Sequence, residues 1–239
     1  MTKDNHDFDS ARFDKDRASG YAERVRRVIP GYDALHDLLR LMIDENTPSD
    51  GHILVAGCGT GEEIIRLGMH GPRLRFMGVD PSGDMLSIAR ERIDRTDIKD
   101  RTTLVEGRVR DLDEDLRFDA ATLMLVLHFI PCGPGPDGKV AFLTEIAKRL
   151  KSGAPLFIAD GLSEPGDPSF EATMAIWRKW RKLHGISEEA ETGNTEKALK
   201  NIPFATPGDE RAILMKAGFR TIQPIYRALH VHGLLAFKG

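Results

Sequence analysis

The stretch Ile53-Leu-Val-Ala-Gly-Cys-Gly-Thr-Gly61 decides how this 239-residue chain folds. Its apolar first half is typical of a short buried β-strand, and its three glycines predict a tight turn that brings backbone close to a ligand. A helix is expected from Glu62, and a second strand over residues 74–79 leads to Asp80. This order indicates the nucleoside-binding half of a doubly wound α/β fold, in which the Asp80 carboxylate accepts the hydroxyls of a ribose.

The spacing of the glycines separates two kinds of ligand. A dinucleotide fold has the pattern G-x-G-x-x-G, which seats a pyrophosphate at the helix N-terminus. Here the glycines are Gly57, Gly59 and Gly61, and Glu62 holds the place of the third dinucleotide glycine. The carboxylates of Glu62 and Glu63 suit the positive end of a helix but would repel a phosphate bound there. The turn therefore favours a cationic ligand without phosphate, such as S-adenosylmethionine, which carries a sulfonium and an ammonium group.

The same segment resembles the first motif of class I S-adenosylmethionine-dependent methyltransferases. The resemblance implies an enzyme that uses S-adenosylmethionine and binds it at Gly57, Cys58, Gly59, Gly61 and Asp80. The alternative interpretation is a phosphate-free glycine turn in another kind of α/β domain. For Asp80, the alternative role is that of an N-cap for the helix that begins near residue 81.

The rest of the chain predicts a Rossmann-like, doubly wound sheet of seven strands, mostly parallel, with an antiparallel C-terminal hairpin and a helical lid. The expected strands are 53–56, 74–79, 102–106, 118–127, 155–159, 220–229 and 231–237. Helices are expected at 21–29, 32–43, 62–69, from 81 onward, and at 139–150, 168–184, 187–200 and 207–217. We divide the chain into an N-terminal arm with cap helices (1–46), a cofactor-binding domain (47–161 and 205–239) and a lid insertion (162–204).

Composition excludes several classes of protein. The formal net charge is −3, so no global field attracts nucleic acid or an anionic membrane. No apolar run reaches the roughly 18 residues that a membrane-spanning helix needs. The two cysteines, Cys58 and Cys132, indicate no disulfide framework, so we expect a cytoplasmic protein. No paired-cysteine motif or trusted histidine pair predicts a metal site. His230 and His232, on one strand face of the expected hairpin, are interpreted as a surface pair.

Further motifs are similar to one branch of the superfamily, the carboxy-S-adenosylmethionine synthases of the tRNA uridine-5-oxyacetic acid pathway. They are Arg27-x-x-Pro30-Gly31-Tyr32, Arg181-Lys-Leu-His-Gly-Ile-Ser-Glu188, Ala198-Leu-Lys-Asn-Ile202 and Lys216-Ala-Gly-Phe219. Matched residue by residue, this resemblance implies cofactor contacts from Tyr32, Gly57, Cys58, Gly59, Asp80, Pro81, Arg108, Val109 and Met124. Met124 stands where that family has an asparagine. The alternative for Tyr32 is packing on the first helix, and for Val109 a place in the core.

Departures from the branch pattern favour ordinary S-adenosylmethionine over its carboxylated form. Val55 stands where an acid usually precedes the first glycine, and Arg108 stands where an acid would bind the adenine amino group, with Asp111 nearby. Glu196 aligns with the lid arginine that holds the extra carboxylate in that family, and a glutamate would repel a carboxylate. The adjacent Lys197 keeps the carboxylated cofactor open as an alternative.

Two residues are candidates for acting on the substrate. His128 follows the fourth strand at the expected rim of the site, where an imidazole acts as a base near neutral pH. Its alternative role is structural, with a hydrogen bond to a neighbouring backbone group. Arg27 is a candidate partner for a carboxylate of the substrate or cofactor, and its alternative is a solvated helix face.

We predict transfer of a methyl group to a small-molecule acceptor by direct displacement at the sulfonium methyl. Alternatives are a carboxy-S-adenosylmethionine synthase-like enzyme acting on an acidic metabolite, an RNA-modifying methyltransferase and a non-catalytic cofactor-binding regulator. The RNA reading rests on Trp177-Arg-Lys-Trp-Arg-Lys182, but an amphipathic lid helix with Ile176, Trp177, Trp180 and Leu183 on one stripe explains the same pattern. The sequence names neither the acceptor nor its reacting atom, and a homodimer is compatible with exposed lid aromatics.

Overall fold

The computed structural model describes residues 20–164, 166–186 and 204–239. One sheet of seven strands runs in the order β3-β2-β1-β4-β5-β7-β6. The strands are β1 (His52–Ala56), β2 (Arg75–Asp80), β3 (Thr102–Glu106), β4 (Ala120–Met124), β5 (Pro155–Gly161), β6 (Phe219–Ala228) and β7 (Val231–Lys238). The first five strands pair in parallel, whereas β7 pairs antiparallel with both β5 and β6. The predicted fold class is confirmed.

The fourth strand is shorter than the apolar run that predicted it. The run was expected to form a strand over residues 118–127, but β4 ends at Met124. Leu125 has a φ of 59°, a left-handed conformation that strands do not adopt, and the chain then enters a 3-10 turn, η4 (Leu127–Phe129). Phe118 makes an isolated bridge to Leu150 instead. The hydrophobicity of the run therefore reflects burial, which continues after the backbone has left the sheet.

The helices agree with the sequence pattern within a few residues. They are α2 (Tyr21–Val28), α3 (Tyr32–Asn46), α4 (Glu62–His70), α5 (Gly83–Ile93), α6 (Lys139–Arg149), α7 (Pro168–Leu183) and α9 (Pro207–Lys216). Side chains of Ser82, Asp167 and Thr206 cap α5, α7 and α9 by accepting hydrogen bonds from backbone N–H groups, which replaces partners missing at a helix N-terminus. The expected helix at 187–200 and the N-terminal arm at 1–18 lie outside the described residues.

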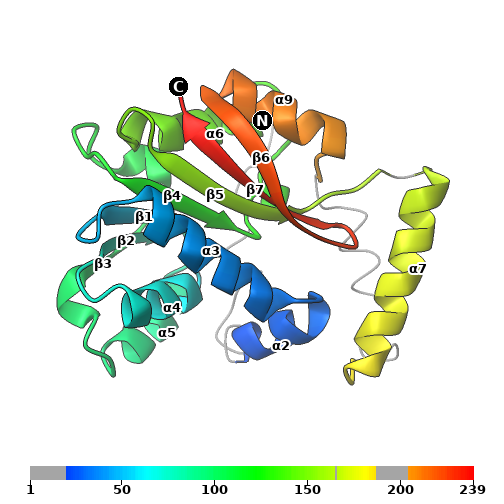
Figure 1. Cartoon of the computed structure of the whole chain (residues 1–239), viewed down its shortest axis with the longest axis horizontal. Helices are drawn as coiled ribbons and strands as arrows, with labels where there is room; N and C mark the ends of the chain where they lie inside the picture. Colours follow the sequence, from blue (N-terminus) through cyan, green and yellow to red (C-terminus); the bar gives the residue numbers. More distant parts are fainter. Residues whose placement is uncertain (1–19, 165, 187–203) are drawn as a thin grey trace, which may run out of the picture.

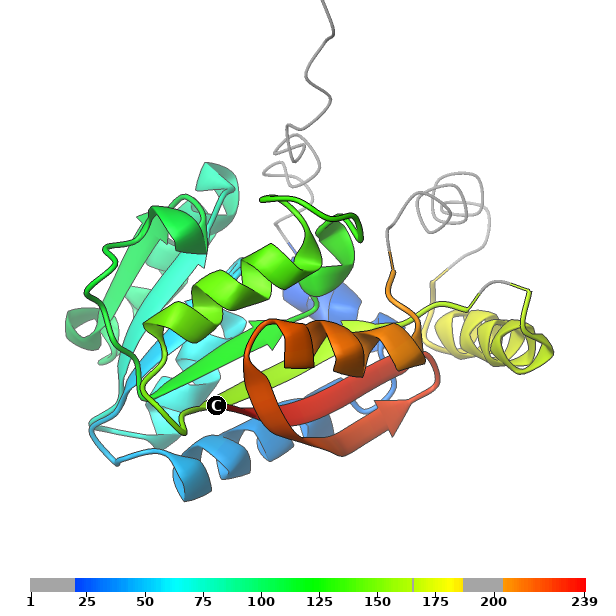
Figure 2. The same ribbon diagram turned by 90° about the horizontal axis from the view of Figure 1, so that it is seen from above.

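Alternation along the central strands divides the core into two layers. Leu54 and Ala56 of β1 face a cluster that includes Leu143 of α6 and Leu214 of α9. The intervening residues of β1 face a second cluster with side chains of α3, α4 and α5, among them Leu35, Leu39, Ile64, Leu67, Leu86 and Ala89. Helices therefore cover both faces of the sheet (Figures 1 and 2), and its carboxyl edge remains available for a ligand.

Helix α7, drawn in yellow in Figure 1, lies outside the sheet and contacts α2. The indole nitrogens of Trp177 and Trp180 donate hydrogen bonds of 2.9 and 3.0 Å to the carbonyls of Val28 and Arg27. The predicted stripe of four apolar residues is only partly buried, because Ile176 and Leu183 are 54% and 79% exposed. No helix within the described residues is long and apolar enough to cross a membrane.

Candidate functional site

A pocket lies at the carboxyl ends of β1, β2 and β4, where the doubly wound fold binds its ligands. The first group of lining residues comes from the glycine turn and the start of α4, and comprises Gly57, Cys58, Gly59, Thr60, Glu62 and Glu63. The second group comes from the ends of β2 and β4 and from neighbouring helices, and comprises Ala22, Tyr32, Asp80, Pro81, Met85, Met124, Leu125, Val126 and Phe129. One site therefore gathers residues far apart in the sequence.

The glycine turn needs its glycines for two separate reasons. Gly57, Gly59 and Gly61 have φ angles of 70°, 50° and 78°, which side chains with a Cβ rarely adopt. A Cβ on Gly57 would also lie 2.4 Å from a methyl carbon of Val126. The segment after β4 is thus packed directly against the turn, and both segments form the floor of the pocket.

Asp80 ties the end of β2 to the glycine turn. One carboxylate oxygen accepts a hydrogen bond of 2.9 Å from the backbone N–H of Gly59, and the other accepts one of 2.9 Å from Ser82. Burial raises the pKa of Asp80, although these two hydrogen bonds oppose the rise. The N-cap of α5 is Ser82 rather than Asp80, because the Ser82 hydroxyl accepts from Met85. Each Asp80 oxygen keeps a further lone pair with which it can accept a ligand hydroxyl.

The two glutamates that follow the turn have different surroundings. Glu62 accepts hydrogen bonds from Arg66 at 2.7 Å and Arg92 at 2.6 Å. Burial alone would raise the pKa of Glu62, but these two guanidinium groups lower it overall. Glu63 is 6% exposed, and burial raises its pKa to about 8. The charge expected at this helix N-terminus is therefore neutralised in two ways, by arginines at Glu62 and by protonation at Glu63.

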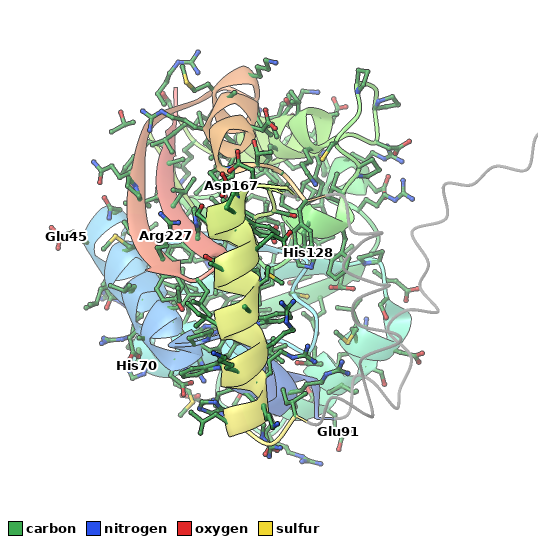
Figure 3. The ribbon with its side chains drawn as sticks, turned by 90° about the vertical axis from the view of Figure 1, so that its right-hand side faces the viewer. Glu45, His70, Glu91, His128, Asp167 and Arg227 are labelled. Atoms are coloured by element: carbon green, nitrogen blue, oxygen red, sulfur yellow. The ribbon has the colours of Figure 1, made fainter. Side chains whose placement is uncertain are left out.

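His128 is held by a carboxylate that the sequence analysis did not identify. Its Nδ1 pairs with Asp160, and its backbone N–H donates to the other oxygen of Asp160 at 2.8 Å. Asp160, at the end of β5, is 2% exposed and also accepts a 2.6 Å hydrogen bond from its neighbour Gly161. A carboxylate only accepts, so Nδ1 is the donor of this pair, and in the neutral imidazole Nε2 then keeps a lone pair. His128 adjoins the pocket residue Phe129 and is labelled in Figure 3.

A signal for Asp160 exists in the sequence, but it depends on the strand order. Asp160 directly follows the predicted strand 155–159, as His128 follows the predicted strand 118–127. Neighbouring parallel strands bring residues after their carboxyl ends together, and β4 does pair with β5. Sequence reasoning also missed six lining residues, which are Ala22, Thr60, Met85, Leu125, Val126 and Phe129.

Most of the predicted cofactor residues meet at this pocket, but not all of them do. Those that line it are Tyr32, Gly57, Cys58, Gly59, Asp80, Pro81 and Met124, while Gly61 precedes α4 at the end of the turn. Val109 is 2% exposed within the core cluster. The Arg108 guanidinium lies 3.3 Å from an Asp137 oxygen. Arg27 pairs with Glu23 on the exposed side of α2 and does not line the pocket.

Two further predictions can be compared with the structure. Asp111, considered as an acid for the adenine amino group, accepts a 2.9 Å hydrogen bond from the backbone of Arg108. His230 was expected in a surface pair, but burial lowers its pKa to about 4 and its ring contacts Trp177 at 4.8 Å. Among the described residues, no group of three or more histidines, cysteines or acids could hold a metal ion.

Comparison with known families shows which kind of domain this site resembles. Residues 54–156 match a family model described as a methyltransferase domain. These residues form a methyltransferase domain, and the chain is similar to S-adenosylmethionine-dependent methyltransferase enzymes. The matched region begins in β1 and ends in β5, so it includes the glycine turn, Asp80 and His128. The resemblance to the class I fold, and S-adenosylmethionine as the cofactor that goes with it, are confirmed.

Two curated relatives bear the name carboxy-S-adenosyl-L-methionine synthase. The protein from Colwellia psychrerythraea is 24% identical over 229 residues, which cover 95% of this chain and 91% of the relative. The protein from Campylobacter hominis is 27% identical over 235 residues, which cover 95% of this chain and 94% of the relative. The similarity extends over nearly the whole length of each protein, in agreement with the branch that the sequence motifs indicate.

Solved structures share the fold at lower identity. A crystal structure of an O-methyltransferase candidate from Nostoc punctiforme PCC 73102 has a TM-score of 0.66 and 15% identity, and the match covers 94% of this chain. The chain spans only 59% of the length of that structure. The likeness therefore concerns the arrangement of helices and strands.

Proposed function

We propose that the enzyme transfers the methyl group of S-adenosylmethionine to a small-molecule acceptor that loses a proton in the reaction. One observation carries the proposal. The described lining of the pocket contains three acids, Glu62, Glu63 and Asp80, and no lysine, arginine or histidine. Arg66 and Arg92 compensate Glu62, and Glu63 is protonated in the empty pocket. A lining with acids and no basic side chain nevertheless favours a ligand with positive charge over a pyrophosphate or an added carboxylate. Ordinary S-adenosylmethionine fits this requirement.

In this proposal the cofactor lies along the carboxyl edge of β1 and β2. The Asp80 carboxylate accepts the ribose hydroxyls, and backbone at Gly57, Cys58, Gly59 and Gly61 supports the methionyl portion. The remaining cofactor contacts are proposed for Tyr32, Pro81, Arg108, Val109 and Met124. Arg108 and Val109 lie outside the pocket lining, so they contact adenine only if the 3-10 turn that contains Val109 moves toward it.

The chemistry is a direct displacement. The acceptor atom attacks the sulfonium methyl, the carbon–sulfur bond breaks, and S-adenosylhomocysteine and the methylated product leave with release of one proton. We propose that His128 Nε2 takes this proton, since Asp160 holds Nδ1 and fixes the tautomer. The protein also aligns acceptor, methyl and sulfur, which lowers the entropic part of the barrier.

The cofactor site is tested by calorimetric titration of stripped protein with S-adenosylmethionine. We expect micromolar binding in the wild type and at least about a tenfold loss in Asp80→Ala, because the ribose hydroxyls lose a charged acceptor. Mass spectrometry of ligand released from fresh protein would identify the natural cofactor. Wild-type protein that binds no adenosyl compound in either experiment would contradict the proposal. Equal affinity in Asp80→Ala would contradict the role of Asp80.

A carboxy-S-adenosylmethionine synthase-like activity is the second candidate. It is favoured by relatives of that name that cover 95% of this chain. It requires cations for the additional carboxylate, and the residues aligned with them, Glu196 and Lys197, lie outside the described residues. Arg27, the other candidate, would have to leave Glu23. Recovery of a carboxylated cofactor from the fresh protein would establish this function in place of methyl transfer.

We also propose the three-part division of the chain into 1–46, 47–161 with 205–239, and 162–204. Two observations support this division. The chain continues from β5 to α7, and α7 contacts α2 rather than extending the sheet. A cytoplasmic location and a homodimer belong to the same proposal. Light scattering of the purified protein would measure the molar mass and decide between one and two chains.

A further inference from the structure

Glu63 is a buried acid in the pocket to which the reaction scheme gives no role. It is the second residue of α4, it lines the pocket, and it is 6% exposed. No lysine or arginine of the described chain comes within ion-pair distance of its carboxyl group. A buried acid without a cation is costly when ionised, so Glu63 would be stabilised in its ionised form by a positive charge that a ligand brings into the pocket.

The groups around Glu63 come from three segments. On α4 itself are Glu62, which disfavours ionisation of Glu63, and Arg66, which favours it. Arg66 is already bonded to Glu62 at 2.7 Å and to Asp33 at 2.6 Å. At the end of β2, Asp80 disfavours ionisation further. The turn contributes the thiol of Cys58, and burial raises the pKa of that thiol.

These surroundings keep Glu63 protonated in the empty pocket. Burial is the largest cause, and it raises the pKa of Glu63 to about 8 even though the backbone N–H of Glu63 opposes the rise. At pH 7 the carboxyl group is therefore mostly neutral. A positive charge placed in the pocket would reverse the balance, because an opposite charge within a few ångströms favours ionisation.

We propose that Glu63 is the counter-charge of the cationic cofactor: it is neutral in the empty pocket, ionises when S-adenosylmethionine binds and passes its proton to solvent. This inference rests on the proposed function. After methyl transfer the sulfonium has become a neutral thioether, so Glu63 takes up a proton again. The pocket thereby distinguishes substrate from product by charge, and S-adenosylhomocysteine is held less tightly than S-adenosylmethionine.

The size of the effect follows from linkage between ligand and proton binding. If the cofactor lowers the pKa of Glu63 by about two units, binding at pH 7 releases roughly 0.8 proton and gains about tenfold in affinity. The affinity for S-adenosylmethionine then rises with pH between about 6 and 7.5. S-adenosylhomocysteine, which has the same amino-acid end but no sulfonium, shows a much smaller release and a flatter dependence.

The experiment is titration calorimetry at pH 7 in two buffers of different ionisation enthalpy, with both ligands and with wild type, Glu63→Gln and Glu91→Gln. We expect proton release with S-adenosylmethionine in the wild type and none in Glu63→Gln, which binds this ligand about tenfold more weakly and S-adenosylhomocysteine almost unchanged. Glu91→Gln is the matched control. It keeps the proton release, because Glu91 is an exposed surface residue that pairs with Arg95 and does not line the pocket.

Each outcome decides a different point. S-adenosylmethionine that binds without proton release, or with the same release in Glu63→Gln, overturns this inference and leaves the proposed function intact. Absence of S-adenosylmethionine binding to the wild type overturns both. If Glu63→Gln does not fold, the wild-type pH dependence of the two ligands decides alone. An affinity that rises with pH for S-adenosylmethionine but not for S-adenosylhomocysteine supports the inference. Parallel pH dependences for the two ligands refute it.

Discussion

Asp160 has the charge and the position to control the tautomer of His128. Its carboxylate is 2% exposed and bonds both the ring and the backbone of His128. An amide at this position could donate to Nδ1 instead of accepting from it, which would leave the proton on Nε2. The imidazole would then be unable to take a proton from an acceptor.

We therefore predict that Asp160→Asn lowers kcat by about 100-fold or more while the affinity for S-adenosylmethionine changes little. The measurement is the pH–rate profile of wild type, Asp160→Asn and His128→Gln with an acceptor found by screening. The limb assigned to His128 should be absent from both variants. The nitrogen chemical shifts of the His128 ring, measured by NMR, give an acceptor-independent check, because they show which ring nitrogen carries the proton. An unchanged profile in Asp160→Asn would make the pair structural.

Residues of the site differ in how far the sequence could predict them. Asp80 and the glycines were accessible because a few contiguous residues impose their geometry. Asp160 was not, because it meets His128 only through the pairing of β4 with β5. Glu63 was expected as a helix-end charge, and its neutral state could not be predicted, since it depends on burial by distant segments.

At the scale of elements, the glycine turn and the segment after β4 act as one unit. A Cβ on Gly57 would lie 2.4 Å from Val126, whereas a Cβ on Gly153 would meet nothing within 4 Å. The two glycines have similar φ angles of 70° and 73°. An alanine at either position would therefore adopt the same unfavourable left-handed conformation. Only at Gly57 would its Cβ also clash with another side chain.

We expect Gly57→Ala to lower the free energy of unfolding by about 1–3 kcal/mol more than Gly153→Ala does. Gly57→Ala should also weaken S-adenosylmethionine binding, because Val126 must move and both segments line the pocket. Urea denaturation of the two variants and wild type measures the first effect, and calorimetry measures the second. Equal destabilisation by the two substitutions would show that Val126 yields without cost.

Element boundaries reveal where sequence patterns lose information. The apolar run at 118–127 predicted one strand, yet the backbone turns at Leu125 with a φ of 59°. Hydrophobicity reports burial, and a buried 3-10 turn is as apolar as a buried strand. Helix starts were clearer, because Ser82, Asp167 and Thr206 supply capping oxygens whose effect is local.

At the scale of the whole molecule, buried acids make stability depend on pH. Glu210, in the first turn of α9, is 3% exposed and has an oxygen without a partner in the described structure. Burial, helped by Asp160, raises its pKa to about 8. The folded chain thus retains a proton that the unfolded chain loses above about pH 4.5, so stability must fall as the pH rises from that value to about 8.

We predict that Glu210→Gln removes much of this decline, which amounts to a few kcal/mol in the wild type. Urea denaturation at intervals from pH 5 to pH 9 would measure it. Glu91→Gln is the matched control, because Glu91 is an exposed surface residue paired with Arg95 (Figure 3). A wild-type stability that is level across this range, or curves of equal slope for wild type and Glu210→Gln, would contradict the prediction. Glu63, whose pKa is also raised by burial, likewise makes the folded state less stable as the pH rises.

The order of the seven strands could be predicted only through family resemblance. Periodicity locates strands and helices, but it does not say that β4 lies beside β1 or that β7 lies between β5 and β6. The resemblance to class I methyltransferases predicted a doubly wound sheet of seven strands with a C-terminal hairpin, but no strand order was derived from it. The placement of α7 followed from neither source, since it depends on two indole hydrogen bonds to α2.

Those two indoles have an optical consequence. The chain contains only two tryptophans, and both donate from α7 to carbonyls of α2. All tryptophan fluorescence of the protein therefore originates at this single helix–helix contact. Emission wavelength and intensity are sensitive to the polarity around an indole, so the unlabelled protein carries its own spectroscopic reporter of whether α7 rests on α2, and stopped-flow mixing can follow that contact during turnover.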